Sequence, residues 1–287
     1  MTDRLSSKNH SPTVRRRRLA AALREARAKS GLSREEVADH MEWSTSKLYR
    51  LEYGRTAASW RDVRDLCELY GVPSPEKDGL IQLARDSRQR GWWSEYQDIF
   101  PSNFVGLETD ASIIRSYESE LVPGLLQTED YARVLNRTFR PTAPDEEIER
   151  RTVARMARQG IFNRDHPPEF TCVLSEAVIR RCLAVGHGVG TAQLEALIAA
   201  SERPNITIRI VPLEAGLHPG MDGAFVIIGF PDPQDPEVAY VEGLMGSVFV
   251  ESIDGVKRYR LAWDQLSGYA LSAAESRDFI RATLKRS

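Results

Sequence analysis

The chain has 287 residues, of which 41% are hydrophobic and 28% are charged, and its formal net charge is −2 at pH 7. No apolar stretch approaches the ~20 residues that a membrane-spanning helix needs, and the N-terminus lacks the apolar core of a secretory signal. We therefore expect a cytoplasmic protein with no membrane partner. The length predicts a multidomain chain, with a small N-terminal domain and a larger second one.

The N-terminal region is predicted to begin with a disordered tail over residues 1–14, followed by a helix over residues 15–29. This helix opens with four consecutive arginines, carries apolar residues at helical spacing and stops at Gly31. A basic run is most often solvated surface, so its meaning depends on the elements that follow it.

The next two helices are predicted from their capping residues. Ser33 and Glu36 have the spacing of a capping box, which predicts a helix that begins near Arg34. After a short break, Ser44 is a preferred N-cap for a helix over residues 45–52. Two short helices joined in this way form either a plain helical hairpin or a helix-turn-helix whose second helix enters a DNA groove.

The helix over residues 45–52 is amphipathic at about 100° of rotation per residue. Leu48 and Leu51 fall on one side, and polar and basic residues fall on the other. Arginine and lysine donate to guanine, and serine and threonine contact any base, so this side suits base edges in a major groove. The predicted base contacts are Thr45, Ser46, Lys47, Tyr49 and Arg50.

Two further helices complete an all-α, five-helix domain over residues 15–88. Ser59 caps the first of them, and the second is expected over residues 75–88. The set resembles the Cro and phage-repressor type of helix-turn-helix, the xenobiotic-response-element class, over residues 15–73.

This resemblance implies roles for three residues. In that class an arginine of the first helix pairs with a glutamate that ends the recognition helix, and Arg27 and Glu52 occupy the matching positions as a structural pair. The class often has a glutamine against a phosphate at the start of its second helix, where this chain has Arg34.

Charge is distributed unevenly along the chain. Residues 1–91 hold 19 Lys and Arg against 13 Asp and Glu, so this part is basic and the remainder is acidic. Positive charge beside a recognition helix is what neutralisation of DNA phosphates requires. The predicted phosphate contacts are Arg15, Arg16, Arg17, Arg18, Arg34 and Arg55.

The C-terminal part is predicted to be an α+β domain over residues 110–287, joined to the first domain by an aromatic-rich connector over residues 89–109. We interpret the clustered tryptophans of the connector as packing rather than as a ligand site. Helices are expected over residues 111–120, 129–139, 145–159 and 191–201 and twice near the C-terminus, and strands over residues 170–174, 206–211, 224–230, 238–242 and 247–251. The expected sheet is mixed and mostly antiparallel.

The segment LETDASIIRSYESELVPGLLQTEDYARVL, residues 107–135, resembles the start of a C-terminal domain of unknown function. That domain follows repressor-type helix-turn-helix domains in actinobacterial regulators of the WhiJ-like kind, and SEAVIRR, VAYVEG and LSAAESRDFI extend the similarity. The resemblance implies a regulator that works with a small partner protein encoded nearby.

The sequence gives little support for catalysis, and we expect no enzyme activity, no cofactor and no metal site. The five histidines are far apart and lack metal-ligand spacing. Three cysteines, Cys67, Cys172 and Cys182, form no C-x-x-C pair, and we expect them to be buried thiols. The loop around His218 is a candidate lining of a binding cleft.

The sequence thus favours a sequence-specific DNA-binding transcriptional regulator that is nucleoid-associated when bound to DNA. A homodimer on double-stranded DNA is expected, because one recognition helix reads only a few base pairs. The alternative is an interaction adaptor or antitoxin-like factor that binds DNA weakly and sequesters a small partner protein. An enzyme controlled by its N-terminal domain is the third and least favoured hypothesis.

Overall fold

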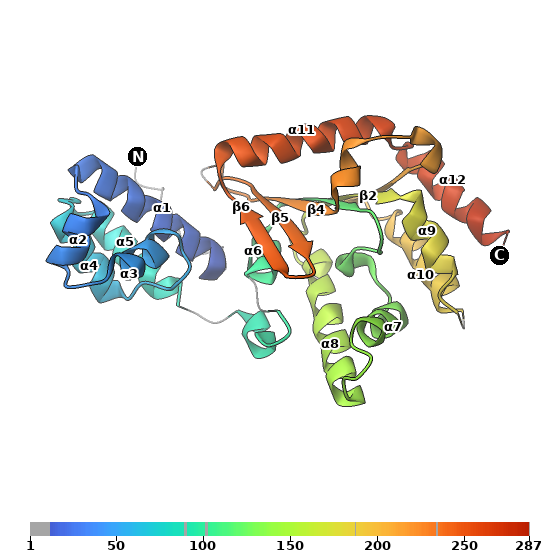
Figure 1. The fold of residues 1–287 in the computed structure, drawn as a ribbon, viewed down its shortest axis with the longest axis horizontal. Helices are drawn as coiled ribbons and strands as arrows, with labels where there is room; N and C mark the ends of the chain where they lie inside the picture. Colours follow the sequence, from blue (N-terminus) through green and yellow to red (C-terminus); the bar gives the residue numbers. More distant parts are fainter. Residues whose placement is uncertain (1–11, 89–90, 101–102, 187, 234, 287) are drawn as a thin grey trace. The chain divides into compact units, whose positions relative to one another are not determined.

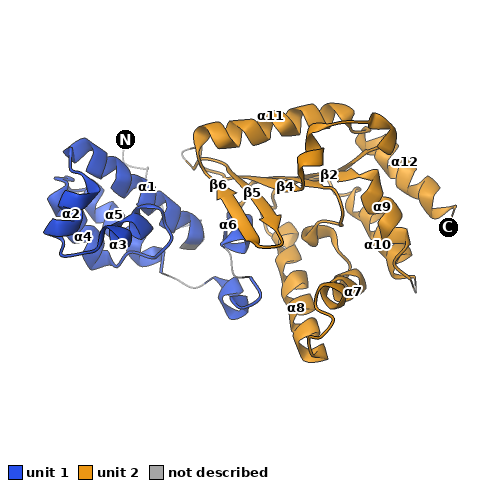
Figure 2. Cartoon of the chain, viewed as in Figure 1, with its two compact units in different colours: residues 1–110 blue, residues 111–287 orange. Residues whose placement is uncertain are grey.

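The computed structural model describes residues 12–88, 91–100, 103–186, 188–233 and 235–286. The chain forms two compact units, Met1–Asp110 and Ala111–Ser287 (Figure 2). Most of the tail predicted over residues 1–14 lies outside the described residues. Residues 12–14 are helical rather than disordered, because the first helix begins at Pro12.

The first unit is all-α, as predicted (Figure 1). All five expected helices are present and are followed by a short 3-10 helix, η1, and one more α-helix, α6. Their bounds are α1 Pro12–Ser30, α2 Arg34–His40, α3 Thr45–Glu52, α4 Trp60–Leu69, α5 Glu76–Asp86, η1 Trp92–Tyr96 and α6 Phe104–Asp110.

The predicted capping residues start the helices as expected. The Ser33 hydroxyl accepts from the Glu36 backbone N–H, and the Glu36 carboxylate accepts from the Ser33 backbone N–H, which completes the capping box of α2. Ser44 accepts from the Lys47 N–H at the start of α3. Gly54 ends α3 with a φ of 62°, a left-handed conformation that costs glycine little.

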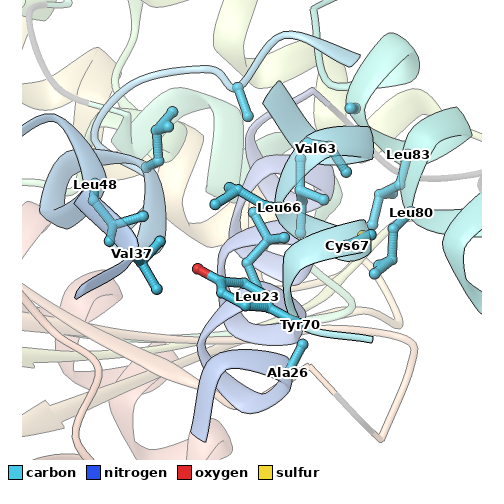
Figure 3. Packing of buried hydrophobic residues seen from close by; sticks show 14 residues of the cluster. Leu23, Ala26, Val37, Leu48, Val63, Leu66, Cys67, Tyr70, Leu80 and Leu83 are labelled. Atoms are coloured by element: carbon cyan, nitrogen blue, oxygen red, sulfur yellow. The ribbon is translucent and has the colours of Figure 1, made fainter. Parts of the chain in front are cut away.

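Apolar side chains from the five helices meet in one core (Figure 3). Figure 3 shows Val37 of α2 and Leu48 of α3 side by side, with Leu23 of α1 and Leu66 of α4 in the same cluster. Val37, Leu48 and Leu66 have no exposed side-chain surface. The core therefore fixes α3 from behind through α1, α2 and α4.

The second unit is built on one six-stranded sheet in the order β3-β2-β1-β4-β5-β6. The pairs β1–β2 and β2–β3 are parallel, and the pairs β1–β4, β4–β5 and β5–β6 are antiparallel. The sheet is mixed and mostly antiparallel, as predicted. The strands are β1 Ile113–Glu118, β2 Glu169–Ser175, β3 Ile206–Val211, β4 Phe225–Gly229, β5 Val238–Gly243 and β6 Gly246–Val250.

Helices cover both faces of this sheet. Tyr117 and Ile227 point from one face into a core that includes Trp263 and Leu266 of α11, while α7, α8, α9 and α10 lie on the other side of the sheet (Figure 1). The helices are α7 Glu129–Phe139, α8 Asp145–Arg158, α9 Glu176–Leu183, α10 Val189–Ala200, α11 Ile253–Tyr269 and α12 Ala273–Leu284, with 3-10 turns η2 Gly124–Leu126, η3 Gln159–Asn163, η4 Leu213–Ala215 and η5 Pro219–Asp222.

One predicted element is wrong. The helix expected over residues 111–120 is the central strand β1, which pairs with β2 on one side and with β4 on the other. Ile114 and Tyr117 point to opposite faces, and both are buried because helices cover both sides of the sheet. A strand of this kind lacks the alternation of apolar and polar residues that identifies a half-exposed strand.

None of the helices within the described ranges combines the length and the apolar character that a bilayer span requires.

Candidate nucleic-acid interface

Helix α3 presents its polar face to solvent. Leu48 and Leu51 are buried, whereas Thr45, Ser46 and Arg50 are exposed. The division follows the helical period, because Ser46 and Arg50 lie on the side opposite to the leucines, while Thr45 flanks that side as the first residue of the helix. This leaves two hydroxyls and a guanidinium on the surface of an eight-residue helix whose back is fixed in the core.

The C-terminal half of α3 carries an aromatic and cationic cluster. The rings of Tyr49 and Tyr53 lie 4.3 Å apart between centroids. The guanidinium of Arg55 lies 5.3 Å from the Tyr49 ring, and that of Arg34 lies 5.5 Å from the same ring. Arg24 lies 5.1 Å from the Tyr53 ring. Stacking on aromatic faces orders these cations without removing their hydrogen-bond donors.

Glu52 holds the arginines around this cluster in position through hydrogen bonds. Its side chain is fully buried and accepts hydrogen bonds from Arg27 and Arg34, the latter at 2.9 Å between Nε and Oε2. Arg24 donates to the backbone carbonyl of the same residue. Arg27 is therefore the partner of Glu52 that the resemblance implies, and Arg34 is a second one. A buried carboxylate needs such partners to offset the cost of its desolvation.

Arg34 contacts both the buried Glu52 carboxylate and solvent. The hydrogen bond that the Arg34 guanidinium donates to Glu52 raises the pKa of Arg34, and 31% of the Arg34 side chain remains exposed. Because a guanidinium has five N–H donors, the contact with Glu52 leaves others for a second acceptor. The structure thus fixes the position of Arg34 at the start of α2.

The arginine run at the start of α1 is less exposed than expected. Arg15 is buried and donates to the backbone carbonyl of Asp86 at 3.3 Å. Its side chain therefore does not face solvent, as the predicted phosphate contact requires. Burial lowers the pKa of Arg16. Arg17 and Arg18 are half-buried, and Arg55 is exposed. Helix α1 packs against α3 and α5, and this packing covers part of the run.

Lys47 is held by two neighbours. Its ammonium lies 3.5 Å from the centroid of the Trp43 ring and 3.9 Å from Oδ1 of Asp62. Trp43 and Asp62 also line a cavity of about 690 Å³. Four carboxylates and three apolar side chains contribute to its walls: Glu42, Asp62, Asp65, Glu68, Met41, Trp43 and Leu69.

Two family models match different parts of the chain. Residues 18–80 match a helix-turn-helix domain, and residues 101–282 match a domain of unknown function, DUF5753, over more than half of the chain. The chain belongs to the DUF5753 family. No curated protein and no solved structure matches it.

The DUF5753 protein therefore carries a helix-turn-helix DNA-binding domain before its family domain. The matches agree with the geometry of α2 and α3, and a DNA-binding domain is typical of a regulator rather than of an enzyme. In the described residues, no group of three His, Cys, Asp or Glu side chains is arranged to hold a metal ion. All three cysteines are free and buried, which confirms the prediction of buried thiols.

Four residues of the interface were missed by the sequence analysis: Arg24, Trp43, Tyr53 and Asp62. Two had a local signal, because Arg24 precedes Arg27 by three positions and Tyr53 follows Tyr49 by four, spacings that place side chains on one helical face, whereas Trp43 lies in the turn before α3. Asp62 had no such signal, since it reaches Lys47 from another helix.

Proposed function

We propose that this protein is a sequence-specific, DNA-binding transcriptional regulator of the Cro and repressor class, which places α3 in the major groove. The observation that carries the proposal is the exposed polar face of α3, fixed from behind by buried Leu48. Hydroxyl and guanidinium groups are donors for base edges. The proposed base contacts are Thr45, Ser46, Lys47, Tyr49 and Arg50.

Phosphate contacts are proposed on both sides of α3. Arg55 follows it and is exposed, and Arg34 precedes it with donors left after its contact with Glu52. Arg16, Arg17 and Arg18 complete the set. Such contacts set the register of the protein on DNA but do not identify the bases.

Two copies are proposed to bind together. One helix of eight residues reads only a few base pairs, so a homodimer on two half-sites about one helical turn apart would supply affinity and specificity.

The α/β unit is proposed to be the regulatory or partner-binding part. Support comes from the hairpin between β5 and β6, where Leu244 and Met245 expose nearly all of their side chains. Adjacent exposed apolar side chains are typical of a surface that contacts a partner.

The test is a binding titration with a duplex selected from random sequences, at several salt concentrations. Arg50→Ala should cost about 1–3 kcal/mol on the selected duplex and relax the preference at one position. Arg34→Ala should weaken binding to all sequences alike and reduce the salt slope by about one unit per half-site. A uniform loss from both variants would contradict these roles.

The alternative, an adaptor that binds DNA weakly and sequesters a partner, gives a different result in the same titration. It predicts a shallow salt slope and little preference for any selected duplex over random DNA.

A further inference from the structure

Lys47 differs from a freely moving surface lysine, because three elements of the helical unit meet at its ammonium. Trp43 lies in the turn before α3, Lys47 is the third residue of α3, and Asp62 is in the first turn of α4. A helical side chain leans toward the N-terminus of its helix, so the ammonium lies beside the first turn of α3. This is the end of a recognition helix that meets base edges.

The contacts hold the ammonium without using its hydrogen-bond donors. A ring centroid at 3.5 Å is within the range of a cation–π interaction, in which tryptophan is the best partner. The 3.9 Å separation from Asp62 is an ion pair and is too long for a hydrogen bond. The three N–H donors of the ammonium therefore remain available to acceptor atoms on DNA, such as those of guanine.

Holding a lysine in advance changes the free energy of binding. A lysine side chain loses much rotamer freedom when it is fixed, and ordering one such side chain on binding costs about 0.5–1.5 kcal/mol. A side chain that is already ordered in the free protein avoids most of this cost. The lower ordering cost favours the duplex that has the base pair read by the lysine. On a random sequence the lysine side chain does not need to take one fixed position, so the lower cost gives little advantage there.

We propose that Trp43 and Asp62 are positioning residues of the DNA interface: they hold the Lys47 ammonium before DNA arrives and so determine discrimination at the base pair that Lys47 reads. The inference rests on the proposed DNA binding and adds two residues that do not themselves contact bases. Because 39% of the Lys47 side chain is exposed, it can be held and still be reached from the groove.

Asp62→Asn separates this role from helix capping. Oδ2 of Asp62 accepts the Ser59 backbone N–H, whereas Oδ1 faces Lys47. Asparagine keeps one oxygen for the cap and loses the charge that attracts the ammonium. Asp65→Asn is the matched control, since it removes the same charge from the same helix at a residue paired with Arg64.

The test compares Kd values for the selected duplex, for duplexes with one base pair changed and for a random duplex. Asp62→Asn should lower discrimination at one base pair by about two- to tenfold, the equivalent of the ordering cost. Trp43→Leu should do the same, and Trp43→Phe should recover part of it. Asp65→Asn should leave discrimination unchanged, and in a Lys47→Met background Asp62→Asn should have no further effect.

A second readout needs no DNA. In the free full-length protein, the ε-methylene protons of Lys47 should resonate upfield because the adjoining Nζ lies 3.5 Å from the centroid of the Trp43 ring, and Trp43→Leu should abolish this shift. If Asp62→Asn changes binding to the selected and random duplexes equally, the inference is overturned and the proposed function stands. If the wild-type protein shows no preference among duplexes, the proposed function fails and the inference fails with it, whatever the NMR shift.

Discussion

Removing the carboxylate of Glu52 should destabilise the helical unit more than removing either of its ion-pair partners. Glu52 is fully buried and accepts from Arg27 and Arg34, whose side chains are 17% and 31% exposed. In Glu52→Gln the two guanidinium groups stay close together and lose the negative charge between them.

The magnitude follows from the burial of the three groups. Removal of one partner from a buried ion pair costs about 3–5 kcal/mol, because the other charge stays buried and unpaired. Both arginines reach solvent and can be partly rehydrated, so we expect about 2–3 kcal/mol for Glu52→Gln. Arg34→Met leaves the pair of Arg27 and Glu52 in place and should cost only about 0.5–1 kcal/mol.

The assay is urea unfolding of the full chain followed by tryptophan fluorescence. Four of the five tryptophans, at positions 43, 60, 92 and 93, lie in the helical unit, so the signal reports mainly on that unit. Glu52→Gln should lower the midpoint without a change in m, as expected when only stability changes. A loss below about 0.5 kcal/mol, or an equal loss in Arg34→Met, would refute the argument from burial.

Three further predictions concern the core, the cysteines and pH. Leu48→Ala should destabilise the helical unit by about 3 kcal/mol, because a fully buried leucine leaves a cavity, and should weaken DNA binding; Thr45→Ala on the exposed face is the control for stability. Burial raises the pKa of Cys67 to about 11 and that of Cys182 to about 12, so iodoacetamide at pH 8 should label both slowly in the folded chain and quickly in urea; equal rates would contradict their burial. Burial also raises the pKa of Glu118 from 4.5 to about 7, so the α/β unit binds this proton more tightly when folded. The stabilisation is complete below about pH 4.5 and should be lost as the pH rises through 7, by about 3 kcal/mol. Circular dichroism melts of Glu118→Gln should lack this part of the pH dependence, and an unchanged profile would exclude Glu118 as its source.

Local signals predicted the helical unit well. The starts of α2 and α4 follow from the Ser33 and Ser59 caps, and the end of α3 follows from Gly54, all within a few residues of the element concerned. In the second unit, β3 was predicted because Ile206, Ile208 and Ile210 alternate with more polar residues. These features depend on neighbours in the sequence, which a single sequence displays.

Contacts between distant residues could not be predicted in the same way. Strand β1 does not show the pattern of a strand in the sequence, because its burial on both faces depends on elements far along the chain. The surroundings of the predicted contacts were missed for the same reason: Arg15 meets the carbonyl of Asp86, and Lys47 meets Asp62. The identity of each residue indicated its chemistry, but its partners are set by the packing of whole helices.

The position of β1 in the sheet has a consequence for synthesis of the chain on the ribosome. Ile113 pairs with Glu169 on one side and with Gly229 on the other, so the central strand has to wait for two partners made much later. Closing such distant contacts is slow compared with local helix formation. During translation the helix-turn-helix unit can therefore mature first, while strand β1, which follows it in the chain, stays without neighbours and is open to chaperones or to aggregation.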